Sequence, residues 1–396
     1  MSVSQYKPKV AISVTNCICF DQRVLKMAET VRSLNCEITI IGRRKGLCCD
    51  TDSVPFRTKR FRMIFKRGFL FYKWFNIRLF FYLLFHRSDI LVANDLDTLL
   101  PNFLVSKLKG IPLIYDSHEY FTGVPELQNR PFVRRVWKSI EKSIFSKLKY
   151  VITVSGSIAR QYESEYGIKP LTVRNCARNS INIIPVSRKE TGIPADHLLL
   201  VLQGSGINVS RGGEEIIDAI SRTQKVTLLI IGSGDALETL KSKVEELKID
   251  NRVHFIDKLP WSELMSYTKS ADAGLSLDKN NNLNHSFSLP NKLFDYLSAG
   301  IPVIAGDLPE VSKIISEYGC GIIIPEITSE KISEALNELI GDPEKLALLR
   351  KNAAIASEKL NWETEREIVI KLYRDVLRQR LKPPSLKLLW PNGVKA

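Results

Sequence analysis

The sequence predicts an α/β protein with two doubly wound parallel sheets. Short apolar runs rich in β-branched residues recur along most of the chain, each separated from the next by enough residues for a helix. Such runs are typical of parallel strands that are buried on both faces. Two successive series of runs indicate two Rossmann-like domains facing each other across a cleft, rather than one oversized sheet. The predicted strands are 10–14, 38–41, 90–93, 111–115, 150–154 and 171–173 in the first series, and 198–202, 226–231, 253–256, 273–277, 301–305 and 321–324 in the second.

The domain boundary is predicted within residues 179–197. This stretch contains Pro185, Thr191-Gly192 and Pro194, and it shows little periodicity between two strand-like runs. The prediction therefore divides the chain into an N-terminal domain, 1–183, and a C-terminal domain, 184–370. A last helical pattern ends before Pro383-Pro384. Residues 371–396 are predicted to be a helix end and basic tail that packs back on the N-terminal domain.

The charges are distributed unevenly along the chain. Residues 1–190 hold 32 Lys or Arg against 15 Asp or Glu, whereas residues 191–370 hold 18 against 27. A basic first half suggests contact with something anionic, such as nucleic acid, an anionic membrane surface or a phosphorylated substrate. A hydrophobic content of 44% and a charged content of 25% exclude a mainly disordered or collagen-like chain.

The cysteines favour a reducing compartment. There are seven of them, an odd number, and none forms a C-x-x-C pair. Neither a disulfide framework nor a structural zinc site is therefore expected.

The segment from Arg57 to Arg87 differs from the rest of the chain. It holds nine Lys or Arg, eleven Phe, Tyr or Trp and no Asp or Glu among its 31 residues. The cations interrupt the apolar stretch too often for a bilayer-spanning helix. We interpret the segment as a basic, aromatic amphipathic helix that contacts an anionic membrane surface. The alternative is a core helix with a solvated charged face. Nucleic acid is disfavoured, because no recognised binding motif accompanies the cations.

Polar side chains follow several predicted strands of the first series. In doubly wound folds, ligands bind beyond the carboxyl ends of the strands. Asp116, His118 and Glu119 follow the fourth strand, and a His beside two carboxylates can transfer protons or bind ligand hydroxyls. Asp21 could equally be the cap of the next helix. The other candidates after the first and third strands are Asn16, Arg23, Asn94 and Asp95.

The second series carries a candidate phosphate site. Gly204 follows a strand, and Arg211-Gly212 precedes a helix. Small residues let backbone amides approach a phosphate, and an Arg adds a fixed cation. The pair Gly232 and Gly234 lacks the third glycine of a dinucleotide fingerprint and is equally explained as a tight turn, so a conventional NAD-dependent oxidoreductase is disfavoured.

The most specific stretch runs from Ser288 to Ala305. Pro290 suits the first turn of a helix, Gly300 ends that helix, and a strand follows. The helix would place Lys292 and Asp295 on one face, where a cation and a carboxylate could hold pyrophosphate and ribose respectively. An ordinary surface ion pair is the alternative.

This stretch resembles the donor-binding signature of GT-B fold glycosyltransferases, in particular the retaining family 4 enzymes. There, a Glu-x7-Glu motif runs into a helix and a Gly-x-Pro-Val-Ile strand. Asp295 takes the second acidic position, which the resemblance implies for the nucleotide ribose. Phe287 takes the first, where the family has a Glu that contacts the donor sugar. The identity of the donor sugar therefore stays open.

The resemblance extends over most of the chain. It implies a donor site in which Arg211 binds the pyrophosphate, Ser205 replaces a first basic residue and Lys292 compensates for it. His118 resembles the family's active-site His, with Asp116 and Glu119 as helpers. Two sets complete the implied site: Gly204, Gly212, Ser288 and Leu289 on the donor side, and Asn16, Arg23, Asn94 and Asp95 on the acceptor side.

The resemblance implies a metal-independent glycosyltransferase without a cofactor. Its donor would be a UDP- or GDP-linked sugar, and its acceptor a lipid-linked glycan or polysaccharide of the cell surface, with retention of configuration. Asp95-x-Asp97 has the spelling of a metal motif, but it falls in the acceptor domain. The expected location is cytoplasmic and peripheral, on the inner face of a membrane. The alternatives are a non-catalytic GT-B partner subunit and a nucleotide-sugar 2-epimerase.

Overall fold

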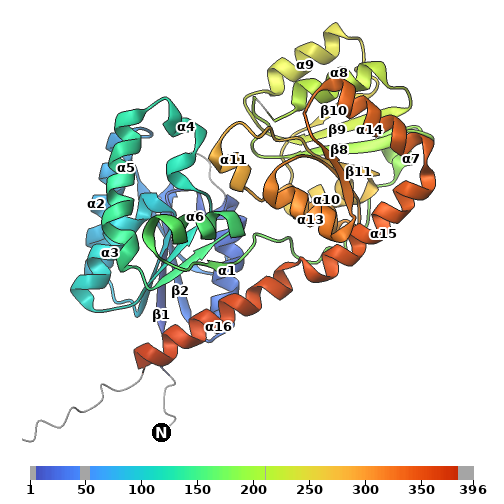
Figure 1. Cartoon of the computed structure of the whole chain (residues 1–396). Coiled ribbons are helices and arrows are strands. Elements are labelled where there is room, and N and C mark those ends of the chain that lie inside the picture. Colours follow the sequence, from blue (N-terminus) through green and yellow to red (C-terminus); the bar gives the residue numbers. More distant parts are fainter. Residues whose placement is uncertain (1–5, 45–53, 210, 382–396) are drawn as a thin grey trace, which may run out of the picture. The chain divides into compact units, whose positions relative to one another are not determined.

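The computed structural model describes residues 6–44, 54–209 and 211–381. Its strands form two sheets, one of seven strands and one of six, and the strands pair in parallel. Helices connect most of the successive strands (Figure 1). The predicted fold class, α/β with two doubly wound Rossmann-like domains, is confirmed.

The first sheet has the order β3-β2-β1-β4-β5-β6-β7, so β1 lies inside the sheet between β2 and β4. Its strands are β1 (Lys9–Ser13), β2 (Glu37–Arg44), β3 (Arg57–Arg62), β4 (Ile90–Asn94), β5 (Leu113–Ser117), β6 (Tyr150–Thr153) and β7 (Leu171–Thr172).

The second sheet has the order β10-β9-β8-β11-β12-β13. Its strands are β8 (Leu198–Gly204), β9 (Val226–Gly232), β10 (Val253–Ile256), β11 (Ala273–Ser276), β12 (Val303–Gly306) and β13 (Gly321–Ile324).

The α-helices fall into an earlier and a later group along the chain. The earlier ones are α1 (Gln22–Arg32), α2 (Phe69–Phe85), α3 (Leu96–Lys109), α4 (Pro125–Gln128), α5 (Pro131–Ile144), α6 (Gly156–Tyr166) and α7 (Arg188–Thr191). The later ones are α8 (Gly213–Arg222), α9 (Leu237–Glu246), α10 (Trp261–Ser270), α11 (Leu283–Phe287), α12 (Asn291–Ser298), α13 (Pro309–Tyr318), α14 (Ser329–Gly341), α15 (Pro343–Lys359) and α16 (Trp362–Leu381).

The chain divides into two compact units. The first contains the residues up to Tyr115 together with the chain from Glu367 onward, and the second runs from Asp116 to Arg366. The last part of α16 therefore belongs to the first unit, where Val369 and Tyr373 are buried. The predicted boundary near residue 184 falls between the last strand of the first sheet and the first strand of the second, and it stays a prediction. The predicted tail beyond residue 381 lies outside the described residues.

In the first unit, α2 and α3 pack side by side on one face of the sheet, with α1 on the other (Figure 1). The prediction of one amphipathic helix across 57–87 is wrong in two respects. Residues 57–62 form β3, an edge strand paired in parallel with β2, and only Phe61 of this strand is buried. The helix α2 is apolar on its outer face as well as on its buried face.

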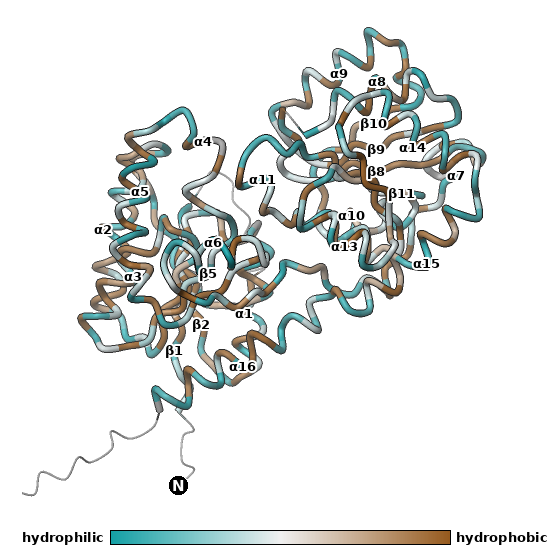
Figure 2. Tube along the Cα trace, in the orientation of Figure 1, coloured by the Kyte–Doolittle hydropathy of each residue, from teal (hydrophilic) through white to brown (hydrophobic). Residues whose placement is uncertain are grey.

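In the second unit, strand residues alternate between two apolar cores. Leu198, Leu200 and Leu202 of β8 point to the core under α8 and α14. Leu199 and Val201 point to the opposite core under α12 and α13. A strand buried on both faces has no polar alternation, which is why the sequence shows β8 as a continuous apolar run. Figure 2 shows these strands as the most hydrophobic part of the unit.

The cysteines differ from the expectation. Cys17 and Cys19 each take part in a disulfide bond. This contradicts the expectation from the odd number and the spacing of the cysteines, which predicted no disulfide framework. Cys36, Cys176 and Cys320 are not in disulfides and are buried, as small side chains in the core.

Candidate functional site

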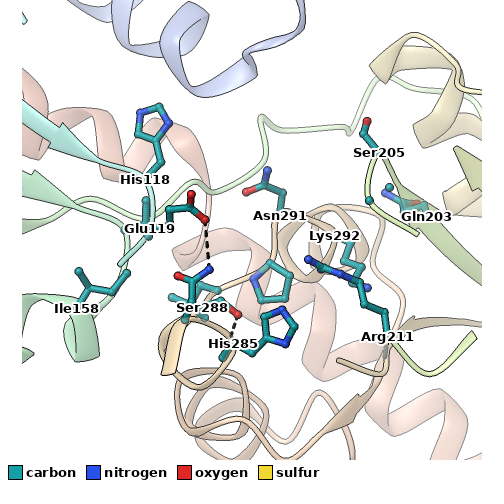
Figure 3. Close-up of a pocket in the computed structure, with 16 residues that line it drawn as sticks. His118, Glu119, Ile158, Gln203, Ser205, Arg211, His285, Ser288, Asn291 and Lys292 are labelled. Carbon is teal, nitrogen blue, oxygen red and sulfur yellow. Dashed lines mark hydrogen bonds between the residues drawn. The ribbon is translucent and has the colours of Figure 1, made fainter. Parts of the chain in front are cut away.

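A cavity of about 360 Å³ lies in the second unit, which is within the size range of small-ligand sites. Gly204, at the end of β8, contributes to its wall. Other parts of the wall come from the loop before α8, the start of α12 and the segment after β5. In Figure 3, Arg211 and Lys292 lie on one side of the cavity, and His118 and Glu119 lie on another.

Arg211 and Lys292 come from different elements but share one carboxylate. Arg211 precedes α8, and Lys292 is the second residue of α12. Asp278, which is 3% exposed, accepts a hydrogen bond from Arg211 Nη1 at 2.9 Å, and its Oδ2 lies 3.2 Å from Lys292 Nζ. Burial alone would raise the pKa of Asp278, but Lys292 and then Arg211 hold that pKa below its ordinary value. Both cations line the cavity, so it can attract an anion.

Glycines are required where backbone segments approach closely beside these cations. Gly212 has φ +72°, and a Cβ there would lie 2.3 Å from the Cβ of Leu277. A Cβ on Gly232 would lie 1.8 Å from the carbonyl oxygen of Gly204. Gly212 thus allows the loop that carries Arg211 to pass over the end of β11. Gly232 and Gly234 do not line the cavity, and the tight turn explains them.

The loop after β5 supplies two titratable side chains of the cavity, His118 and Glu119. His118 Nε2 lies 3.6 Å from Oδ2 of Asp116, a fully buried residue of β5. Glu119 Oε2 accepts a hydrogen bond from Asn284 Nδ2 at 3.2 Å, and Asn284 Oδ1 accepts one from the backbone N–H of Tyr120 at 3.1 Å. His118 and Glu119 both line the cavity.

The segment before α12 shows what stands at the position of the absent Glu. Phe287 is not part of the cavity wall, since its ring packs edge-on against Tyr120 at 6.1 Å and its carbonyl oxygen accepts a hydrogen bond from Ser155. Asn284 and His285 line the cavity instead. Polar groups therefore reach the cavity from α11, but from other positions than the family motif implies.

The remaining donor-side predictions divide into two groups. Ser205, Ser288 and Leu289 line the cavity. Asp295 does not; its carboxylate accepts hydrogen bonds from Gln203 Nε2 at 3.1 Å and from Trp261 Nε1 at 3.0 Å. Gln203 does line the cavity, so Asp295 contributes to its wall through a neighbour.

The predicted acceptor-side residues lie in the first unit, after β1 and β4, which are neighbours in the sheet. Asn94 is buried, and its Nδ2 donates to the carbonyl oxygen of Ser13 at 3.0 Å. Asp95, with φ +57°, precedes α3. Arg23 is buried within α1, whereas Asn16 is exposed. The Asp21 side chain accepts a hydrogen bond from the backbone of Val24, as the capping interpretation expects.

A second cavity of about 410 Å³ lies in the first unit, at the amino ends of β1, β2 and β3. It contains Lys9 and Arg57, but both pair with Glu37, and the Lys9–Glu37 separation is 4.0 Å. Glu37 therefore offsets part of the positive charge of a wall that also includes Arg87. The cavity lies at the edge opposite to the one where doubly wound folds bind ligands.

Within residues 6–44, 54–209 and 211–381, no three His, Cys, Asp or Glu side chains gather closely enough to hold a metal ion. Metal independence of the chemistry stays a prediction.

Sequence reasoning missed Asp278, Gln203, Asn284, His285 and Asn291. Asp278 and Gln203 are single polar residues at strand ends, and only the sheet order shows that β8 and β11 are neighbours. Asn284 and His285 belong to the short helix α11, in which nothing in the sequence distinguishes a cavity-lining Asn from an exposed one. Asn291 is the first residue of α12, where an exposed polar residue is equally common.

Two parallel Rossmann-like sheets, and a cavity with two cations at the strand ends of the second, define a ligand-binding α/β protein of the doubly wound class. Comparisons with known proteins specify the family. The family model of the glycosyl transferases group 1 matches residues 185–355, and that of glycosyltransferase family 4 matches residues 21–177. The chain belongs to the GT-B fold glycosyltransferases of this group 1 and family 4 type.

Individual relatives are distant. A chitobiosyldiphosphodolichol beta-mannosyltransferase of Candida albicans is 23% identical over 278 residues, which are 63% of this chain and 59% of that protein. The chain thus spans about three fifths of the length of this curated relative. The solved sucrose-phosphate synthase of Thermosynechococcus elongatus has a TM-score of 0.77 at 17% identity, covering 94% of this chain and 100% of that one. HepE of Anabaena, solved in complex with UDP-glucose, has a TM-score of 0.74 at 16% identity and covers 93% and 99%.

Proposed function

We propose that the chain transfers a sugar from a UDP- or GDP-linked donor to a lipid-linked or polysaccharide acceptor in cell-surface glycan synthesis. The observation that carries this proposal is the convergence of Arg211 and Lys292 on one cavity that also holds His118 and Glu119. A cavity with a cationic end and a hydroxyl-binding end suits a ligand with a diphosphate at one end and a sugar at the other.

The proposed chemistry breaks the bond between the sugar C1 and the diphosphate oxygen, and it forms a bond from C1 to an acceptor hydroxyl oxygen. The hydroxyl proton leaves with the departing diphosphate or passes to a base. Arg211 and Lys292 would stabilise the negative charge that develops on the leaving diphosphate, without a metal ion. His118 and Glu119 would bind and orient the sugar. Retention of configuration is part of the proposal.

Two relatives support parts of this proposal. HepE has been solved with UDP-glucose, which fits a nucleotide sugar as donor. The Candida albicans relative is named for a diphosphodolichol substrate and a mannosyl group, which fits a lipid-linked acceptor. Retention at C1 of the transferred sugar can be tested by NMR, from the coupling constant at its anomeric position in the product.

Calorimetric titration with UDP, GDP and ADP tests the donor site. Selective binding of one nucleotide, weakened in Arg211→Ala, is expected. No binding of any nucleotide would contradict the proposal and favour a non-catalytic partner subunit. Conversion of the matching nucleotide sugar without an acceptor would instead indicate a 2-epimerase.

We further propose that α2 contacts an anionic membrane surface. Ile77, Phe81 and Phe85 recur every fourth residue and are 39%, 51% and 77% exposed. The buried face of the helix uses other side chains, among them Phe75, so this outer apolar row is not needed for the core. Nine cations without an acidic residue between Arg57 and Arg87 make an anionic lipid surface the complementary partner.

The membrane proposal concerns surface contact rather than insertion. No helix in the described part of the chain is long and apolar enough to cross a bilayer. The proposed location is therefore peripheral, on the inner face of a membrane, where anionic lipids are found.

Flotation with vesicles tests this contact. The wild type is expected to bind vesicles that contain phosphatidylglycerol and not vesicles of phosphatidylcholine alone. The double variant Phe81→Ser/Phe85→Ser should bind roughly tenfold more weakly, because two large apolar side chains are removed. Phe132→Ser, which changes a 72% exposed ring on α5, is the control. Unaltered binding of the double variant would exclude α2 as the contact, and a change in oligomeric state would indicate a second copy of the chain as its partner.

A further inference from the structure

Asp278 stands apart from the other carboxylates near the cavity, because it faces both cations and not the cavity itself. It lies two residues after β11 and is 3% exposed. Arg211 and Lys292 line the cavity, with side chains that are 34% and 11% exposed, whereas Asp278 is absent from its wall. The carboxylate is thus placed behind the two cationic heads.

Asp278 contacts the two cations through different oxygens. Arg211 Nη1 donates a hydrogen bond to Oδ1 at 2.9 Å, which fixes the guanidinium plane. Lys292 Nζ forms an ion pair with Oδ2 at 3.2 Å. Each oxygen of the carboxylate is thus directed to one of the two cations.

A buried carboxylate is retained only where its charge is compensated, and here two cations compensate one. Without Asp278, the Arg211 and Lys292 heads would repel each other and lose their common anchor. With it, they converge from two separate elements and keep one net positive charge. Such a pair, fixed before a ligand arrives, lowers the entropy that binding must overcome.

We propose that Asp278 is a positioning residue, which holds Arg211 and Lys292 in the arrangement that binds the diphosphate of the donor. The inference rests on the proposed function, since it requires a diphosphate ligand. The change in anion binding that it predicts on removal of Asp278 is opposite in sign to the change expected from charge alone. Removing a negative charge beside an anion site should strengthen anion binding if charge alone mattered. If Asp278 acts by positioning, its removal should weaken anion binding.

The test compares the wild type with Asp278→Asn, using UDP, GDP and inorganic pyrophosphate as separate calorimetric probes. We expect the Kd of the nucleotide that binds to rise roughly tenfold in Asp278→Asn. Asp272→Asn is the matched control, because Asp272 also lies between two cations, 2.5 Å from Arg188 and 3.6 Å from Arg350, but away from the cavity. It should lower the melting temperature without changing the Kd.

A double-mutant cycle distinguishes positioning of Lys292 by Asp278 from a general loss of folding in the Asp278→Asn variant. If Asp278 acts through Lys292, then Asp278→Asn should weaken binding much less in a Lys292→Gln background than in the wild type. Binding by Asp278→Asn that equals or exceeds that of the wild type, or additive effects in the cycle, would overturn the inference. Absence of nucleotide and pyrophosphate binding by the wild type would overturn the proposed function itself.

Discussion

Asn284 hydrogen-bonds both to the side chain of Glu119 and to the backbone of the next residue, Tyr120. Its Nδ2 donates to Glu119 Oε2 at 3.2 Å, and its Oδ1 accepts from the backbone N–H of Tyr120 at 3.1 Å. One amide thereby fixes both the side chain of Glu119 and the course of the chain just after it. Because Asn284 is itself buried, both hydrogen bonds are shielded from water and specify a single loop conformation.

We expect Asn284→Ala to separate catalysis from nucleotide binding. The substitution leaves the Tyr120 N–H without its acceptor, at a cost of about 1–3 kcal/mol, and releases Glu119. Sugar transfer should fall roughly tenfold or more, because Glu119, which we propose orients the sugar, is then poorly placed. The Kd for the nucleotide should stay within about twofold, since Arg211 and Lys292 are not touched. Steady-state kinetics and calorimetry on the same preparation measure both.

Ser286→Ala provides the control for α11. The Ser286 hydroxyl bonds to residues nearby in the chain, Asn280 and the carbonyl oxygen of Asn282, the latter at 3.0 Å. Wild-type kinetics are expected for this variant. Equal losses in the two variants would mean that α11 as a whole, rather than the amide of Asn284, supports the site.

Gly212→Ala should destabilise the second unit strongly. The left-handed backbone, with φ +72°, costs an Ala about 1–2 kcal/mol. The new Cβ would also lie 2.3 Å from the Cβ of Leu277 and 2.8 Å from its carbonyl oxygen. Overpacking of this kind costs about 1–3 kcal/mol more. Since Leu277 precedes Asp278, the displaced backbone should also weaken nucleotide binding.

Gly300→Ala isolates the backbone contribution. Gly300 has φ +71°, but nothing lies within 4 Å of a Cβ built there. Urea unfolding should therefore show a smaller loss for Gly300→Ala than for Gly212→Ala. Equal losses would show that the contact with Leu277 carries no penalty.

The sequence predicts the central strands well, because strands buried on both faces are short continuous apolar runs. The predictions for the interior strands β4 and β9, 90–93 and 226–231, each end one residue before the observed strands, Ile90–Asn94 and Val226–Gly232. The edge strand β3, Arg57–Arg62, was missed. Phe61 is the only buried residue of this strand, and the others are exposed or half-buried. Its sequence therefore shows no apolar run. An edge strand of this kind is recognised by its pairing with the neighbouring strand, here β2, rather than by its own residues.

The candidate site was predictable where a residue type alone indicates chemistry, and not where it depends on a partner. Arg211, Lys292 and His118 stand out in the sequence and all line the cavity. Asp278 does not stand out, since its role comes from two side chains that are distant in sequence. Phe287 was identified as a departure from the family motif, but only the fold shows that it packs on Tyr120.

Asp295→Ala should raise the donor KM. The Asp295 carboxylate accepts a hydrogen bond from Gln203, which lines the cavity, and another from Trp261. Loss of the carboxylate removes one of two hydrogen bonds that fix the Gln203 side chain, the other coming from Thr268 Oγ1 at 2.7 Å, in addition to any direct contact of Asp295 with the donor. Trp261→Phe removes only the second hydrogen bond and should leave KM nearly unchanged. Wild-type kinetics in Asp295→Ala would remove this residue from the donor site.

Two glutamates beside Lys138 should give the stability opposite dependences on pH. Burial would raise the pKa of Glu165, but hydrogen bonds from Lys138, Tyr120 and Gln161 lower it to about 2 from its ordinary 4.5. Its stabilisation is therefore present above pH 4.5 and is lost as the pH falls towards 2. Burial raises the pKa of Glu141, and the opposing effects of Lys138 and of hydrogen bonds from Thr122 and Tyr166 do not cancel that rise. Ionised Glu141 thus destabilises the native state at neutral pH.

The variants Glu165→Gln and Glu141→Gln test the two signs separately. Glu165→Gln should be less stable than the wild type at pH 7, and the difference should shrink between pH 4.5 and 2 as the wild type takes up its proton. Glu141→Gln should be more stable than the wild type at pH 7, and this gain should disappear at low pH, where Glu141 is protonated in both states. Urea unfolding at a series of pH values measures both differences. A Glu141→Gln variant that is less stable at pH 7 would show that the ion pair with Lys138, at 3.5 Å, outweighs the burial of the charge.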